Sequence, residues 1–181
     1  ASRISATSER MTASEISRYI SFLIGRNFHE LAYYTWLQFL PREELGRLSP
    51  LYNRSFEIAP SGLPFDWILT QGSGVTTEIR PRSDKSDENA LFVEFGQGRA
   101  EFPGVTQLTL LGPGTSELKG KYKGTLLGPR GLIWRETCAG AQALTQSDLL
   151  RGDIPQWRDF TLSFTVPQAG CRAQQVRLDL D

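Results

Sequence analysis

Hydrophobic side chains recur at two different intervals along this chain, and the interval changes near Ser49. Upstream they recur every three or four residues, as on one face of an α-helix. Downstream they alternate with polar residues, and Gly, Pro and Asp interrupt the alternation at short, regular distances. Such alternation is typical of antiparallel strands in a sandwich or barrel. The pattern predicts a mainly β chain, with an antiparallel β-sandwich over residues 49–181 and a helical hairpin within residues 1–48.

Two helices are expected in the first part. Thr12 and Glu15 have the spacing of a capping box, which begins a helix that Gly25 ends. A second helix with a broad apolar face runs from Phe28 until Pro41 ends it. Because only a short turn separates the two helices, we expect them to pack as a hairpin.

The second helix carries a Glu-Leu-Ala segment at residues 30–32, followed by Trp36. This pattern resembles one unit of a tetratricopeptide-type array, in which a small Ala lets neighbouring helices approach. One unit cannot bury both of its faces, so the resemblance implies docking on the sandwich or further repeats upstream, and we favour further repeats. Residues 1–10 lack the apolar stretch of a signal peptide, and we expect any leader to be removed.

The alternation after residue 49 is clearest where Leu91, Val93 and Phe95 point one way while Phe92 and Glu94 point the other. Residues 80–89, rich in Ser, Asp and Lys, are expected to form a solvated loop. The segments that we interpret as strands are residues 55–58, 67–70, 76–80, 90–95, 105–111, 115–123, 132–138, 142–145, 158–166 and 174–180.

Composition narrows the range of partners and activities. The 20 basic and 20 acidic residues give a formal net charge of zero, so nucleic acid is not an expected partner. The apolar runs are shorter than the roughly 20 residues of a membrane helix, so membrane insertion is not expected. A single histidine, His29, leaves a catalytic triad in the sandwich without a base. We therefore do not expect an enzyme, although a glycan-active one could use two of four acids: Glu78, Glu94, Glu101 and Glu136.

The two cysteines, Cys138 and Cys171, each lie at the end of a predicted strand. A disulfide between them is our first interpretation, and it would indicate a periplasmic or extracellular location. The alternative is a pair of reduced, buried thiols in a cytosolic protein.

Several short motifs after residue 50 occur in a particular order. That order resembles galactose-binding-like jelly-roll modules, including carbohydrate-binding modules of the family 4 and family 9 kind. The motifs are Asn53-Arg-Ser-Phe-Glu57, Trp67, Val105-Thr-Gln-Leu before Gly112-Pro-Gly, the segment 157–164, Val166-Pro167 and the final Val176-Arg-Leu-Asp-Leu. The resemblance covers about residues 51–181 and implies a jelly-roll sandwich that binds polysaccharide.

Carbohydrate binding would need an aromatic ring for the sugar face and polar side chains for its hydroxyls. Trp134 is the best aromatic candidate and Tyr122 a second. Alternation places Glu136 on the same face as Trp134, and Arg135 beside them on the other face. Core packing is the alternative role for Trp134, since buried Trp is common.

The resemblance also implies a structural calcium ion between the first and last strands. The matching acids are Glu57 and Asp179. Calcium needs six to eight oxygens, so two carboxylates are compatible but not sufficient. The alternative for Glu57 is a structural role with backbone amides or an arginine such as Arg177.

Together these observations predict a non-catalytic carbohydrate-binding module of a bacterial envelope or secreted repeat protein. A structural or protein-interaction domain without sugar binding is the alternative, with the helical hairpin as the surface that recruits a protein partner.

Overall fold

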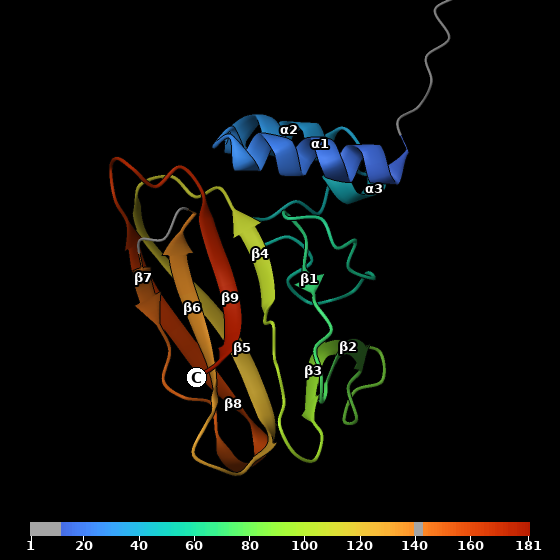
Figure 1. Ribbon diagram of the computed structural model, residues 1–181, viewed down its shortest axis with the longest axis vertical. Helices are drawn as coiled ribbons and strands as arrows, with labels where there is room; N and C mark the ends of the chain where they lie inside the picture. Colours follow the sequence, from blue (N-terminus) through green and yellow to red (C-terminus); the bar gives the residue numbers. More distant parts are fainter. Residues whose placement is uncertain (1–11, 140–142) are drawn as a thin grey trace, which may run out of the picture.

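The computed structural model describes residues 12–139 and 143–181, and it is mainly β with antiparallel sheets, as predicted (Figure 1). Three helices precede nine strands in the described residues. They are α1 (Ala13–Gly25), α2 (His29–Leu37), α3 (Arg42–Leu45), β1 (Ile68–Leu69), β2 (Val75–Pro81), β3 (Asn89–Phe95), β4 (Val105–Thr109), β5 (Gly114–Leu126), β6 (Leu132–Cys138), β7 (Ala143–Gln146), β8 (Gly152–Val166) and β9 (Gln174–Leu180). No helix in residues 12–139 or 143–181 is long and apolar enough to cross a membrane.

The start of α1 is the capping box that the sequence predicts. The Glu15 backbone N–H donates to Thr12 Oγ1 at 3.3 Å, and the Thr12 N–H donates to Glu15 Oε2 at 2.7 Å. The second helix is shorter than expected, because it ends at Leu37 rather than at Pro41. The chain then tightens into turns before the single helical turn of α3.

The helices share one hydrophobic core with the β region. Ile20 of α1 and Trp36 of α2 are buried together with Tyr52, Phe65 and Leu108. The rings of Trp36 and Tyr52 meet edge to face with centroids 5.0 Å apart. Figure 1 shows α1 and α2 lying across one end of the strands. The segment 12–48 is therefore anchored on residues that lead into the sheet.

The strands form one large sheet and two separate strand pairs. The large sheet has the order β1-β4-β9-β6-β7, with every neighbouring pair antiparallel. The long pair β5–β8 and the shorter pair β2–β3 form separate sheets, which share no ladder with each other or with the large sheet in the described part of the chain. None of these sheets closes on itself.

One predicted strand, residues 55–58, is wrong. The segment is a loop that Asn53 holds together, since its Nδ2 donates to the Ile58 carbonyl at 2.9 Å and its Oδ1 accepts from the Ile58 N–H. Asn53 and Phe56 both have positive φ, which interrupts an extended backbone. The carbonyl of Asn53 also accepts the indole N–H of Trp67 at 3.1 Å.

The large sheet contacts both strand pairs through apolar side chains, and a disulfide joins β6 to the loop before β9. Val105 of β4, Leu178 of β9 and Trp67, which precedes β1, are buried in a cluster that includes Leu118 of β5 and Trp134 of β6. Cys138, at the end of β6, and Cys171 form the predicted disulfide, next to buried Phe164 and Val166.

Candidate functional site

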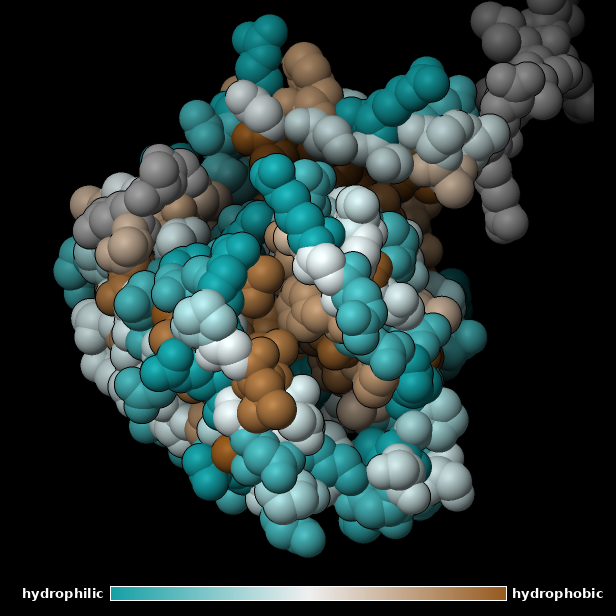
Figure 2. All heavy atoms as spheres, turned by 60° about the horizontal axis from the view of Figure 1, so that its bottom comes forward, coloured by the Kyte–Doolittle hydropathy of each residue, from teal (hydrophilic) through white to brown (hydrophobic). Residues whose placement is uncertain are grey.

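An open groove of about 1230 Å³ separates β3 from β5. Its two long sides are residues 89–96 and 118–127, and its floor comes from the large sheet and β8. Figure 2 shows this hollow as an apolar surface surrounded by hydrophilic residues. The size exceeds that of most small-molecule sites and suits an extended ligand.

Aromatic side chains make up much of the floor. Trp134 lies with its ring centroid 6.1 Å from Phe160 at an interplanar angle of 14°, and its other neighbour Trp67 is also 6.1 Å away. Tyr122 lies 6.4 Å from Phe160 and extends the aromatic surface along β5. Trp134, Phe160 and Tyr122 are all half-buried, so each ring retains some accessible surface inside the groove.

Glycine in β5 allows this arrangement. A Cβ on Gly120 would lie 2.6 Å from Cε1 of Phe160, so only glycine lets the Phe160 ring lie over β5 at this point. Two residues further on, the β5–β8 ladder shifts register between Tyr122 and Gly124. The shift bends the strand pair and separates this part of β5 from regular pairing.

The side of the groove formed by β3 is an unpaired strand edge. The Gly96 N–H donates to Gly74 and the Arg82 N–H donates to Glu88, which fixes the phase of the β2–β3 ladder. In an antiparallel ladder the hydrogen-bonded positions alternate. The backbone groups of residues 90, 92 and 94 therefore point to β2, while those of residues 89, 91, 93 and 95 point to the groove. Within the described residues no other strand pairs with them.

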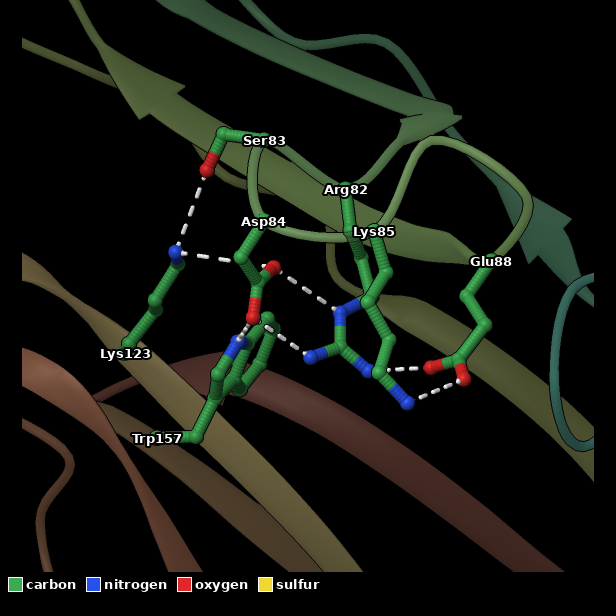
Figure 3. Close-up of polar contacts among 7 residues, drawn as sticks. All are labelled: Arg82, Ser83, Asp84, Lys85, Glu88, Lys123 and Trp157. Carbon is green, nitrogen blue, oxygen red and sulfur yellow. Dashed lines mark hydrogen bonds and ion pairs between the residues drawn. The ribbon is translucent and has the colours of Figure 1, made fainter.

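A group of polar contacts, which we call the clasp, joins the β2–β3 loop to β5 and β8 beside the groove (Figure 3). Asp84 is its centre: its carboxylate accepts from the Arg82 guanidinium at 2.7 Å and from the Trp157 indole N–H at 2.9 Å. The Arg82 guanidinium lies over the Trp157 ring at 4.6 Å, and Lys123 of β5 donates to Ser83 Oγ at 3.1 Å. We define the clasp as these five residues.

The clasp also sets the ionisation of Asp84. Hydrogen bonds from Arg82, together with its own backbone and Trp157, hold the pKa of the Asp84 carboxyl well below its usual range. Sequence reasoning treated residues 80–89 as a solvated loop and did not identify this cluster. The closely spaced opposite charges at Arg82, Asp84, Lys85 and Glu88 were the available signal.

Glu136 lies two residues further along β6 than Trp134 and does not line the groove. It is fully buried, and neither carboxylate oxygen has a hydrogen-bond partner. Burial raises the pKa of Glu136 to about 8. A side chain in this position cannot read the hydroxyls of a ligand in the groove, although alternation correctly put it on the same face as Trp134.

Arg135 points away from the groove, on the opposite face of β6. Its guanidinium contacts Asp179 Oδ2 and Asp181 Oδ1, each at 3.0 Å. Of the four residues proposed to bind sugar, the structure thus brings Trp134 and Tyr122 to the groove and places Arg135 and Glu136 elsewhere.

The two acids expected to hold calcium do not form a shared site. Asp179 pairs with Arg135 and Arg177 on the outer face of the sheet. Glu57 lines the groove with a largely exposed side chain, 3.9 Å from the Arg47 guanidinium. In residues 12–139 and 143–181 no three candidate ligands gather as a metal site would need. The residues present therefore do not fit a calcium ion between the first and last strands.

Comparison of the chain with protein-family models finds no match, and comparison with curated proteins finds none either.

Proposed function

We propose that this chain is a non-catalytic binding domain and that its ligand lies in the groove between β3 and β5. The groove itself carries the proposal: it has about 1230 Å³ of open space with an aromatic floor, against about 310 Å³ for the recess beside Trp36. Large apolar recesses with a polar rim are the usual place for a ligand. The proposal includes a jelly-roll sandwich in which the large sheet forms one layer and the two strand pairs form the other.

Polysaccharide is the ligand class that the sequence resemblance implies, and Trp134 and Tyr122 support it, since aromatic faces pack against the C–H faces of sugar rings. Polar side chains on the rim, such as Arg54, Glu57 and Glu94, could bind hydroxyl groups.

Affinity electrophoresis in gels that contain xylan or β-glucan tests this ligand class. Retardation of the wild type, lost in Tyr122→Ala and kept in Tyr34→Ala, would support it. Tyr34 is a suitable control because its side chain is 61% exposed on α2, outside the groove. Equal migration of all three proteins with and without polysaccharide would exclude these glycans.

A protein-interaction role is the second candidate, and two observations favour it. The first is the unpaired edge of β3 along the groove. The second is a set of exposed hydrophobic side chains in the helical part of the chain, which would suit a protein partner or neighbouring repeats of the tetratricopeptide kind. They are Tyr19, Phe22, Phe28, Leu31, Tyr34, Phe39 and Leu45.

A periplasmic or extracellular location is proposed with this function. The disulfide between Cys138 and Cys171 supports it, because such bonds persist in oxidising compartments.

A further inference from the structure

We propose that the groove binds an extended polypeptide segment, which adds as a strand to the free edge of β3. This inference rests on the proposed function, since it takes the groove as the ligand site, and it names the partner. The occupant would be a short segment with apolar side chains at alternate positions.

The first argument is the unsatisfied backbone along β3. Residues 89, 91, 93 and 95 direct their N–H and C=O groups into the groove, and the described chain supplies no strand to pair with them. A row of backbone donors and acceptors at the strand repeat is complementary to another extended backbone, as in other strand-addition complexes. A sugar chain has no such regular repeat of alternating amide donors and acceptors.

The second argument is that the two edges of the β2–β3 pair are protected differently. Pro81 is the last residue of β2 and lies opposite Asn89. Because the backbone of Asn89 points away from β2, the backbone of Pro81 points away from β3. The Pro81 nitrogen, which carries no hydrogen, therefore lies on the outer edge of β2. Proline is a common way to prevent strand addition at an exposed edge. The β3 sequence Asn-Ala-Leu-Phe-Val-Glu-Phe has no proline, no bulge and one charge. The edge that faces the groove is therefore the one left open to pairing.

The third argument is that the groove offers an apolar floor for one face of an added strand. Side chains of an added strand would alternate between the floor and the solvent. The floor offers Trp134, Phe160, Leu118 and Leu132, which would cover the apolar set. The rim carries charges of both signs, which would accommodate polar residues in the other set.

Selection from a display library of random 12-residue peptides tests the inference on the full chain with its disulfide intact. We expect enriched peptides with apolar residues at alternate positions. For a synthetic copy of one such peptide, N-methylation of one alternate set of amides should weaken binding about tenfold or more, because several backbone hydrogen bonds are lost. N-methylation of the other set should have a smaller effect. Equal tolerance of both methylated forms would overturn strand addition.

Variants at Val93 give a matched pair on the protein side. Val93→Pro removes a groove-facing N–H but no hydrogen bond to β2, whereas Val93→Ala keeps the N–H and shortens the side chain. We expect the proline variant to lose peptide binding at least tenfold more than the alanine variant. Because a proline variant can fail to fold, its folding is checked by circular dichroism. If the variant is unfolded, the N-methylated peptides alone test strand addition.

The outcomes separate this inference from the proposed function. If no peptide is enriched but xylo- or gluco-oligosaccharides shift the NMR signals of Trp134 and Tyr122, the groove remains the binding site and strand addition is wrong. If neither peptides nor these sugars perturb Trp134, both proposals fail. If peptides bind and the amides of Leu91 and Val93 become protected from exchange, both are supported.

Discussion

The indole of Trp134 and the ring of Phe160 lie 14° from parallel with centroids 6.1 Å apart, one from the large sheet and one from the β5–β8 pair. Their stack is the point where β6 and β8 meet at the floor of the groove. The same two rings therefore join the large sheet to the β5–β8 pair and form part of the surface that a ligand in the groove would contact.

Trp134→Ala should destabilise the protein by about 2 to 4 kcal/mol, because the stack with Phe160 and the edge contact with Trp67 are both lost. Trp134→Phe keeps an aromatic ring and should lose less than half as much. Urea unfolding followed by circular dichroism measures both. Equal, small losses would show that the ring does not bridge the layers.

Glu136 should make the protein less stable as the pH rises. Its folded pKa of about 8 lies above the value of an unfolded glutamate, so between about pH 4.5 and pH 8 the folded state binds more protons than the unfolded state. The free energy of unfolding should fall across this pH window by roughly a few kcal/mol and stay constant above it. Glu136→Gln should be more stable than the wild type at pH 8 and show little of this fall. Parallel curves of unfolding free energy against pH for the two proteins would contradict the burial of an unpaired carboxyl.

The hydrogen bond from the Trp157 indole N–H to Asp84 should weaken in acid. Because Arg82 and Trp157 hold the folded pKa of Asp84 below its unfolded value, the stabilisation is present above that unfolded value and is lost as the pH falls through the folded pKa. The exchange rate of the Trp157 indole proton, measured by NMR, should rise at low pH and in Asp84→Asn at neutral pH. Ser83→Ala, which removes only the contact to Lys123, should change it less. An indole proton that exchanges equally fast in all three proteins would argue against the clasp.

The disulfide should contribute substantially to stability. Cys138 and Cys171 are 33 residues apart, and a closed loop of that length gives at most about 4 kcal/mol from restricting the unfolded chain. The double variant Cys138→Ser, Cys171→Ser should therefore unfold at lower urea concentration than the oxidised wild type. A reducing agent should shift the wild type but not the variant. Two thiols titrated in denatured, non-reduced protein would show that the bond is absent.

Calcium should have no effect on thermal stability. Asp179 is already paired with Arg135 and Arg177, and Glu57 lies on the other side of the large sheet. The melting temperature should be the same in millimolar calcium and in chelator. A rise in the melting temperature with calcium that disappears in Asp179→Asn would contradict this arrangement.

Alternation of apolar and polar residues predicted strands well where one face of the strand is buried and the other is not. The segment 90–95 corresponds to β3, and the capping box at Thr12 begins α1 as expected. The loop around Asn53 was missed because its conformation depends on side-chain hydrogen bonds to Ile58, which apolar spacing does not reveal.

The candidate site could be predicted only in part. Alternation gives the face of a side chain but not its depth, so Trp134 and Glu136 looked equivalent although one lines the groove and the other is fully buried. The groove itself depends on which strands fail to pair. No local pattern in β3 or β5 reveals that their facing edges stay apart.

Amide hydrogen exchange along β3 tests the central claim most directly, namely that this strand has one paired and one open edge. In the free protein, the amides of Ala90, Phe92 and Glu94 should exchange slowly, since they are bonded to β2, while those of Leu91, Val93 and Phe95 should exchange quickly. Slow exchange at all six amides would contradict the account, because it would mean that β3 is paired on both sides and that no open groove exists.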